Sequence, residues 1–408
     1  MPTTYLDNNA TTPPAPEVID AIDRAHRELW ANPSSVHRFG QSVRQKIELA
    51  RATVARLIAA TPRELLFTSG GTESNNLALH GTLRPALKQN RRAILITTAV
   101  EHAAVREPAQ QLADEGVNVI NLPIDPDGVV NPADLANTLA ELCAADDPAT
   151  ALVSIHWANN ETGVIQPIID IAAVVAEARA TLRKEGRRTT ITLHTDATQA
   201  VGKLPVDTTL APVDLMTFAA HKFHGPKGAG VLYLRRGVRL TPQQRGGPQE
   251  LDRRGGTENT PAILGLAAAA ELAITFLNDT ERIQHLRQLR DNFEQLLLDQ
   301  IPGSLINAQD RDRLWNTTSI AFPGVEAEAI LLGLSERGVC ASAGAACSSG
   351  SLEPSPVLLA MGMDRARAHG TIRLSLSRLI DEHDLQTAAK ALIAVVSRLR
   401  QTMPMAEN

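Results

Sequence analysis

The sequence predicts an α/β protein with a large domain, built on a mainly parallel β-sheet, and a smaller α+β domain. Its 408 residues exceed the size at which one hydrophobic core keeps growing, so about two domains are expected. With 43% hydrophobic and 21% charged residues, the chain has the composition of a globular protein. Between about residues 53 and 233, short apolar runs alternate with helical stretches, which is the pattern of parallel strands joined by helices.

Seven apolar runs in this region are predicted strands. They are residues 64–68, 93–97, 117–120, 150–155, 191–194, 215–218 and 231–234. Because the carboxyl ends of parallel strands meet at one edge of the sheet, the loops at that edge are expected to carry the functional site.

A segment rich in Gly, Arg and Glu, residues 248–261, is the predicted break between the domains. The elements predicted after it are a long helical region over 262–300, a strand over 317–322, a helix over 327–337, a strand over 371–376 and a terminal helix to about residue 400. We therefore predict a large domain over residues 14–260 and a small domain formed by residues 1–13 and 261–408, which carries the Cys347 loop.

Composition also narrows the class of protein and its surroundings. The longest apolar stretch, residues 262–270, is too short to span a bilayer and predicts a packed helix. The first residues show no targeting signal, so a cytoplasmic protein is expected. A net charge of -5 argues against a nucleic-acid partner. The three cysteines form neither a disulfide framework nor a metal-ligand spacing, which fits a reducing compartment.

Lys222 and Asp196 are the two residues that point to a cofactor. Lys222 follows the apolar strand at 213–220, and a lysine held largely out of water can lose its proton and act as an amine nucleophile. Asp196 closes another strand, and a buried carboxylate needs a cationic partner such as a protonated pyridine nitrogen. Either residue alone would more often be a surface lysine or an N-capping aspartate. Together they are the anchors that pyridoxal phosphate (PLP) requires, so a PLP enzyme is predicted.

A candidate phosphate site follows the strand at 64–68, in the segment Ser-Gly-Gly-Thr-Glu-Ser-Asn-Asn at 69–76. Glycines allow close approach of the backbone to a ligand, and the free amides of a helix N-terminus attract an anion. Gly71 and Thr72 are the candidate ligands. The alternative is a turn followed by a capped helix.

Three further polar residues follow predicted strands. His102 could lie flat on a cofactor ring and move protons, although a lone histidine is more often structural. Asn160 and Gln199 could donate hydrogen bonds to the phenolic oxygen of the cofactor.

Cys347 lies in a stretch of small residues, 341–351, which predicts a loop rather than a packed element. A loop with an exposed thiol suits a nucleophile that reaches a substrate and then carries a product away. Free cysteine is nonetheless usually a small buried hydrophobic residue, and Cys143 and Cys340 are assigned to the core.

These residues lie in motifs that resemble those of the PLP-dependent cysteine desulfurases of the NifS/IscS family, with the wording nearest to the nitrogen-fixation NifS branch. The motifs are residues 5–12, 71–74, 157–163, 194–203, 221–222 with 225–228, 256–259, Cys347 with 351–355, and 368–373. They occur in the family's order over nearly the whole chain, which makes the resemblance highly specific.

The resemblance implies a fold-type I PLP-dependent transferase (aminotransferase-like) and a homodimer that takes sulfur from L-cysteine. By this resemblance Lys222 binds the cofactor aldehyde covalently and Asp196 pairs with the pyridine nitrogen, while His102 stacks on the ring. The phosphate ligands are Thr72 and His221, together with Thr257 of the partner subunit. Asn160 and Arg373 hold the substrate carboxylate.

The resemblance also implies that Cys347 accepts the sulfur as a persulfide and passes it to an acceptor such as an iron–sulfur scaffold protein, with His102 as the candidate acceptor of the thiol proton. Alternatives are a selenocysteine lyase or an aminotransferase on the same fold, or a catalytically silent binding protein. The chain departs from the family by alanine at 219, 343 and 345, where serine is common, and by a longer segment at 179–190.

Overall fold

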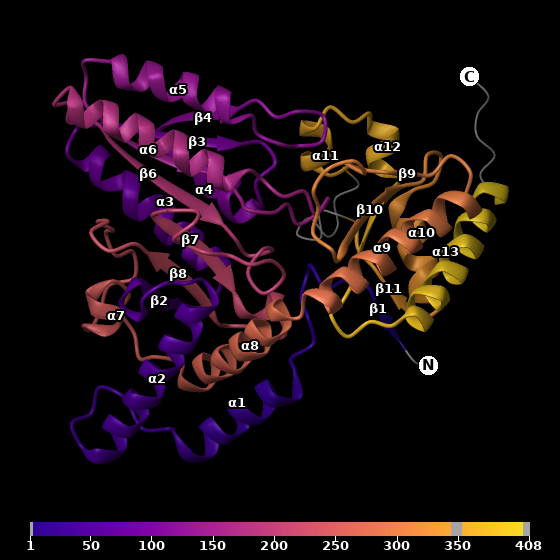
Figure 1. Cartoon of the computed structure of the whole chain (residues 1–408), viewed down its shortest axis with the longest axis horizontal. Coiled ribbons are helices and arrows are strands. Elements are labelled where there is room, and N and C mark those ends of the chain that lie inside the picture. Colours follow the sequence, from indigo (N-terminus) through magenta and orange to yellow (C-terminus); the bar gives the residue numbers. More distant parts are fainter. Residues whose placement is uncertain (1–2, 344–352, 403–408) are drawn as a thin grey trace.

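The structure is a computed structural model that describes residues 3–343 and 353–402. Figure 1 shows a large part built around one sheet and a smaller part formed mainly by the last third of the chain, with the N-terminal strand lying in the smaller part. Hydrophobic clusters lie on both faces of the large sheet, and a separate cluster fills the smaller part. The predicted domain boundary near residue 260 stays a prediction.

The large sheet has seven strands in the spatial order β2, β8, β7, β6, β5, β3, β4. Their bounds are β2 (Leu65–Thr68), β3 (Arg92–Thr98), β4 (Asn118–Leu122), β5 (Ala149–Ser154), β6 (Thr190–Asp196), β7 (Leu215–Ala219) and β8 (Gly230–Leu234). All seven predicted strands are present, within a few residues. β3 to β7 are parallel, which confirms a mainly parallel sheet, whereas β8 runs antiparallel to both neighbours. The short turn between β7 and β8 reverses the chain, and only a longer crossover could keep it parallel.

Helices cover both faces of this sheet, which explains why its strands are apolar throughout. On one face lie α3 (Gly71–Lys88) and α4 (Ala103–Asp114), which pack on residues such as Leu95. Ile94 and Ile96 alternate with Leu95 and point to the opposite face. The helices on that face include α2 (Arg38–Leu57), α5 (Pro132–Ala144), α6 (Ile168–Lys184) and α8 (Thr260–Asn278), and α1 (Pro16–Glu28) packs against α8.

Within the described ranges, α8 alone is long and apolar enough to cross a membrane by length and composition. Its Leu266, Ala269 and Ala273 are fully buried in the core of the large part. The apolar character of α8 is therefore that of a packed core helix, as predicted for residues 262–270.

The smaller part contains an antiparallel sheet of β9 (Leu305–Ile306), β10 (Thr317–Ala321) and β12 (Thr371–Ser375), and a parallel pair of β1 (Thr4–Tyr5) and β11 (Val339–Cys340). The helices packed on them are α9 (Thr280–Gln300), α10 (Ala327–Ser335) and α13 (Glu382–Thr402). The remaining short helices are α7 (Gln249–Asp252), α11 (Pro356–Ala360) and α12 (Arg365–His369). The single predicted region at 262–300 is two helices, because Asp279 ends α8 and its side chain caps the first turn of α9.

Residues 6–12 link the two parts. Leu6 accepts a backbone hydrogen bond from Ser375 of β12, and Thr12 donates one to the carbonyl of His221 in the large part. This N-terminal segment therefore lies where the strand ends of the large sheet face the smaller part.

Candidate active site

A cavity of about 800 Å³ opens at the carboxyl ends of the parallel strands, beside the smaller part. Its walls include residues 9–10, the start of α3, the loops after β3, β5, β6 and β7, and residues 353–359. Nine of the predicted site residues line it: Gly71, Thr72, His102, Asn160, Asp196, Gln199, His221, Lys222 and Arg373. Residues far apart in the sequence therefore meet at the sheet edge where the site was expected.

Lys222 ends a single 3-10 turn, Ala220–Lys222, directly after β7. Its Nζ donates hydrogen bonds to the carbonyls of Asn9 and Ala10, each at 2.8 Å. The turn is tight, because a Cβ on Gly225 would come within 2.7 Å of Ala220. The amine is thus fixed at the cavity wall by both the turn and the N-terminal segment.

Asp196 ends β6 and is 7% exposed. Its Oδ2 accepts a hydrogen bond from Asn75 Nδ2 at 2.7 Å, and its Oδ1 accepts one from the backbone of Thr198 at 2.9 Å. The second bond caps the turn after β6, which is the structural role that the sequence offers as the alternative for Asp196. Capping of this turn does not prevent the carboxylate from pairing with a cation in the cavity. Asn75 was missed from the sequence, although it lies within the motif at 69–76.

The N-terminus of α3 faces the cavity at Gly71 and Thr72. Its position depends on glycine in the neighbouring strand, because a Cβ on Gly230 would come within 2.5 Å of the Gly70 backbone. The 18-residue helix directs its free amides and the positive end of its dipole into the cavity.

His221 lies beside this cradle. Burial, and then the positive charges of Lys222, Lys227 and Lys203, lower the pKa of His221 to about 4. At neutral pH the imidazole is therefore uncharged, and it could bind an anion as a hydrogen-bond donor but not as a cation.

Two imidazoles line the cavity with opposite hydrogen-bond partners. His102 caps α4, and its Nδ1 accepts the backbone N–H of Ala104 at 3.0 Å, so the neutral ring carries its proton on Nε2. His156 Nδ1 instead lies 2.9 Å from Glu101 Oε1, which also accepts the His156 backbone N–H at 2.8 Å. A carboxylate can only accept, so His156 holds its proton on Nδ1. Neither Glu101 nor His156 was identified from the sequence, although both follow predicted strands and Glu101 directly precedes His102.

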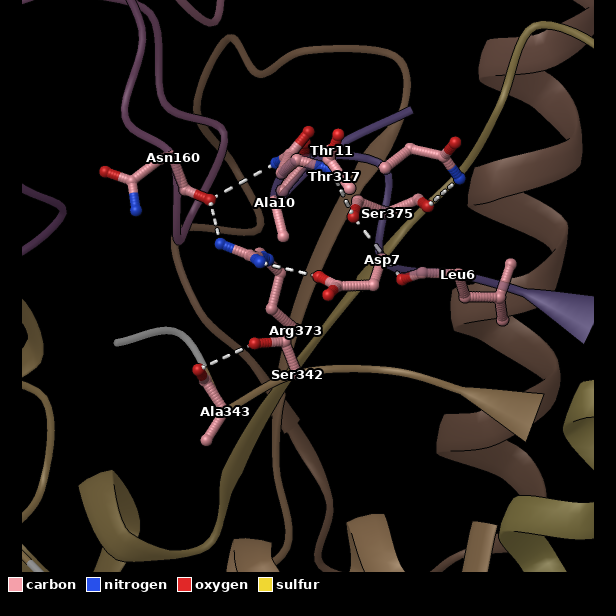
Figure 2. A network of polar contacts seen from close by, with 12 residues as sticks. Leu6, Asp7, Ala10, Thr11, Asn160, Thr317, Ser342, Ala343, Arg373 and Ser375 are labelled. Carbon is pink, nitrogen blue, oxygen red and sulfur yellow. Dashed lines mark hydrogen bonds and ion pairs between the residues drawn. The ribbon is translucent and has the colours of Figure 1, made fainter. Parts of the chain in front are cut away.

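Arg373 lies on β12 and is 2% exposed. Its guanidinium donates to the Asn160 carbonyl at 2.9 Å and to Asp7 Oδ1 at 2.8 Å, as Figure 2 shows. The Asn160 side chain extends away from this contact in the same view. Arg373 is thus a buried cation held in place at the cavity. Asp7, which orients it, was not identified as a site residue from the sequence, although it lies within the motif at 5–12.

Glu161 lies next to Asn160 and is 4% exposed. Its Oε2 accepts a hydrogen bond from Ser355 Oγ at 2.6 Å, and Ser355 caps α11. Burial raises the pKa of the Glu161 carboxyl, while Ser355 and the nearby Arg373 act in the opposite direction.

Thr257 does not line this cavity. It lies with Arg254 and Glu250 in a second cavity of about 170 Å³, next to β2 and β8. The adjoining α7 is a left-handed turn, because Glu250 and Leu251 have φ angles of 47° and 58°. This strained turn is held by Glu250, whose carboxylate forms two hydrogen bonds, at 2.7 and 2.9 Å, with the buried guanidinium of Arg51.

The cysteines differ in position. Cys347 lies outside the described residues. Cys143 is buried in the core as predicted, and burial raises the pKa of its thiol. Cys340 is only partly buried, so its assignment to the core was wrong. It lies on the two-residue strand β11, which pairs with β1 alone.

Three of the departures from the family pattern fall in described regions, and one of them, Ala343, packs partly buried against the core of the smaller part. Ala219 is 1% exposed, close to the start of α3, so the methyl group fills a place where a serine hydroxyl could reach the anion cradle. In the longer segment at 179–190, Arg179 donates to the Ile191 carbonyl at 3.0 and 3.2 Å and pairs with Asp214. Arg179 thereby ties the end of α6 to the sheet.

The cavity is suited to a flat, phosphorylated ligand. Four residues that line it each carry a buried polar atom with no hydrogen-bond partner among the described residues: Asn75 Oδ1, Glu101 Oε2, His156 Nε2 and Thr198 Oγ1. Buried polar atoms are normally hydrogen-bonded, so such atoms around a cavity indicate a polar ligand. An anion cradle, a carboxylate and an amine in one cavity match the phosphate, ring nitrogen and aldehyde of PLP.

The chain is similar to known proteins over its whole length. The family described as aminotransferase class-V matches residues 4–387. Cysteine desulfurase 2 of Trichormus variabilis is 44% identical over 408 residues, covering 100% of this chain and 96% of the relative. Cysteine desulfurase NifS of Azotobacter vinelandii is 42% identical over 405 residues, covering 99% and 95%. A solved NifS-like protein superposes with a TM-score of 0.86 at 36% identity, covering 97% of this chain and 100% of that one. The chain therefore belongs to the class-V aminotransferase family, among the NifS/IscS cysteine desulfurases.

Proposed function

We propose that this protein is a PLP-dependent cysteine desulfurase that converts L-cysteine to L-alanine and holds the sulfur as a persulfide on Cys347. The observation that carries the proposal is the meeting of Lys222, Asp196 and Arg373 in one cavity. An amine, a carboxylate and a guanidinium are the three charged groups that a PLP enzyme acting on an amino acid needs. The relatives named cysteine desulfurase supply the choice of amino acid.

Different residues of the cavity would bind different groups of the cofactor. Lys222 would bind the aldehyde, Asp196 would pair with the ring nitrogen, and His102 would lie against the ring. The phosphate would bind at Gly71 and Thr72 with His221, joined by Thr257 of the partner subunit. Asn160 and Gln199 would donate to the phenolic oxygen. When bound, the cofactor supplies an acceptor for the electrons that are released at the substrate Cα.

Arg373 binds the substrate carboxylate and needs little rearrangement to do so. Asp7 and the Asn160 carbonyl already hold its guanidinium, which favours one orientation before the substrate arrives. Lys222, once its amine is released, is the base that removes the Cα proton. Lys222 and Arg373 thus act on neighbouring groups of the substrate, the Cα and its carboxylate, from different walls of the cavity.

His102 is better suited to give a proton than to take one. The Ala104 N–H occupies Nδ1, so the neutral ring presents Nε2–H to its surroundings. This arrangement is contrary to the assignment of His102 as the acceptor of the Cys347 thiol proton. We assign His102 instead as the donor that returns a proton to the substrate fragment.

In the overall reaction, the Cys347 thiolate attacks the substrate sulfur as the carbon–sulfur bond breaks. The sulfur stays on the enzyme as a persulfide, and the carbon fragment takes up a proton and leaves as L-alanine. We propose a homodimer located in the cytoplasm that passes the persulfide sulfur to an iron–sulfur scaffold or another acceptor protein.

Two variants test the proposal. Cys347→Ala should bind PLP and L-cysteine but lose alanine and sulfide production by several orders of magnitude, because no thiolate accepts the sulfur. Lys222→Ala should bind PLP without a covalent link and should not turn over. Borohydride reduction of the wild type followed by peptide mapping should place the cofactor on Lys222.

Three results would contradict the proposal. They are a cofactor adduct on Lys203 or Lys227, near-normal alanine formation by Cys347→Ala, and a persulfide mapped to Cys143 or Cys340. Activity on selenocysteine that greatly exceeds the activity on cysteine would favour a selenocysteine lyase instead.

A further inference from the structure

Lys203 is a buried amine directly behind the candidate active site. It is 4% exposed and follows the turn after β6. Within residues 3–343 and 353–402, no carboxylate forms an ion pair with it. A buried ammonium without a carboxylate is costly, and burial together with the charges of Lys222 and Arg373 lowers the pKa of Lys203 well below its ordinary value. Such a residue needs compensating hydrogen bonds.

The two acceptors of Lys203 belong to the frame of the site. Its Nζ donates to Gln199 Oε1 at 2.5 Å and to Asn9 Oδ1 at 2.8 Å. Gln199 in turn donates from Nε2 to the Asn9 carbonyl at 2.9 Å, the same carbonyl that receives Lys222 Nζ at 2.8 Å. Lys203, Gln199 and Asn9 therefore form a closed ring of hydrogen bonds. Lys222 is attached to this ring through the Asn9 carbonyl.

This ring decides which way the Gln199 carboxamide faces. Lys203 Nζ donates to the carboxamide oxygen of Gln199, and this contact leaves Gln199 Nε2 directed toward the Asn9 carbonyl. Gln199 lines the cavity, whereas Lys203 does not, so the effect of Lys203 on a ligand passes through Gln199.

Asn9 forms further hydrogen bonds that involve neither Lys203 nor Gln199, so its position does not depend on Lys203 alone. Its backbone N–H donates to Ser375 Oγ at 2.9 Å, its side chain donates to Thr317 Oγ1 at 2.9 Å, and Asn316 donates to its Oδ1 at 3.1 Å. Loss of Lys203 should therefore leave the N-terminal segment near its place while it frees the Gln199 carboxamide to turn.

We propose that Lys203 is a positioning residue of the active site. It holds the Gln199 carboxamide so that one Nε2 hydrogen binds the Asn9 carbonyl, which also receives Lys222, and the second Nε2 hydrogen is available to the cofactor. The inference rests on the proposed function, because Gln199 and Lys222 act on PLP. Under this proposal, buried Lys203 has a role in the active site in addition to its packing between the large and the smaller part.

The test compares Lys203→Met with the wild type as the holoenzyme. Methionine keeps the length of the side chain and removes the donor. The matched control is Lys390→Met, an exposed lysine on α13 that does not line the cavity. The readouts are the visible absorption band of the bound cofactor, the Kd for PLP, and kcat and KM for L-cysteine. Both lysine variants are also made in a Gln199→Met background.

Lys203→Met should shift the visible band, weaken PLP binding about tenfold and lower kcat more than it changes KM. These effects should largely vanish in the Gln199→Met background, because the carboxamide that Lys203 orients is absent there. Lys390→Met should change none of these quantities. If Lys203→Met does not fold, Lys203→Leu, which also lacks a donor, is measured against the same expectations.

The proposal for Lys203 is overturned if its variant has the wild-type band and PLP affinity, or if its effect is equally large without the Gln199 carboxamide. The second result would mean that Lys203 acts only on folding. A wild-type protein that binds no PLP would overturn the proposed function together with this inference, which distinguishes the two failures.

Discussion

At the scale of single residues, hydrogen-bond partners decide what each polar group at the cavity can do. His102 and His156 are the same residue type at the same cavity, yet a backbone N–H holds one and a carboxylate holds the other. These contacts place a proton on Nε2 of His102 and on Nδ1 of His156. The sequence predicts His102 as a proton acceptor, whereas its contact with Ala104 supports the proposed role of proton donor.

The carboxyl of Glu161 should make the stability of the folded protein depend on pH. Burial raises the pKa of its carboxyl, so the folded state favours the protonated form. The stabilising contribution is complete below the ordinary glutamate pKa and is lost as the pH rises through the raised value. Glu161→Gln stays neutral and keeps an acceptor for Ser355, so it lacks this loss.

We therefore expect Glu161→Gln to gain stability over the wild type as the pH rises. Its Tm minus that of the wild type should be larger at pH 8 than at pH 4.5 by at least about 1 °C, the shift that about 1 kcal/mol gives for a chain of this length. Thermal unfolding at the two pH values measures this difference. An equal difference at both pH values, or a larger one at pH 4.5, would mean that the carboxyl is not the source.

At the scale of elements, the anion cradle depends on how closely two backbones approach. The turn before α3 lies against β8, and the missing side chain of Gly230 makes room for Gly70. β8 can stand there because the short turn after Lys222 brings it back beside β7. One turn thus places both the lysine and the strand that supports the helix N-terminus.

Replacement of Gly230 by alanine should displace this turn. The new Cβ would lie 2.5 Å from the Gly70 backbone, and backbone cannot move aside as a flexible side chain can. We expect Gly230→Ala to lose about 1–3 kcal/mol of stability and to bind PLP more weakly. Chemical unfolding and PLP titration measure the two effects.

Gly70→Ala is the matched control for stability. A Cβ at Gly70 would meet no atom within 4 Å, and its φ of 161° is extended backbone that alanine adopts. It should lose much less stability than Gly230→Ala. Equal losses would show that the close contact is not the cause.

At the scale of the whole molecule, the site requires three distant parts of the chain. The N-terminal segment supplies acceptors for Lys222 and an aspartate for Arg373, the large sheet supplies the cofactor residues, and β12 supplies the arginine. Thr257 lies apart, beside a second cavity in its own chain. This position suits the proposed role of Thr257 in the site of the partner subunit.

Mixed dimers test that role. In a heterodimer of Thr257→Ala and Lys222→Ala chains, a shared site would leave one cavity with both lesions and one with neither. Activity should then recover to about half that of the wild-type dimer, since one of two sites is intact. The measurement is the alanine production of purified, differently tagged heterodimers.

The Thr257→Ala homodimer provides the baseline for this experiment. If each site is built from one chain, the heterodimer should reach no more than half of that baseline. Such a result would remove Thr257 from the proposed phosphate site.

The sequence by itself determined the strands, the sheet edge and most of the residues that meet there. Apolar runs such as Ala93 to Thr97 predict strands because both faces of this sheet are covered, and the residues after those strands are at its carboxyl edge. Lys222 and Asp196 were identifiable because each follows such a run. Periodicity and strand ends are local properties, so they can be recognised in the sequence alone.

Only the tertiary structure decided the direction of β8 and the partners of the polar groups. Asp7, Asn9 and Lys203 act through residues that lie far away in the sequence, as with the 366 positions between Asp7 and Arg373. The tautomer of His102 depends on a single capping bond, and the isolation of Thr257 depends on a strained turn held by Arg51. Such hydrogen bonds form where folding brings a donor close to an acceptor from a distant part of the chain. Local sequence patterns therefore do not predict them.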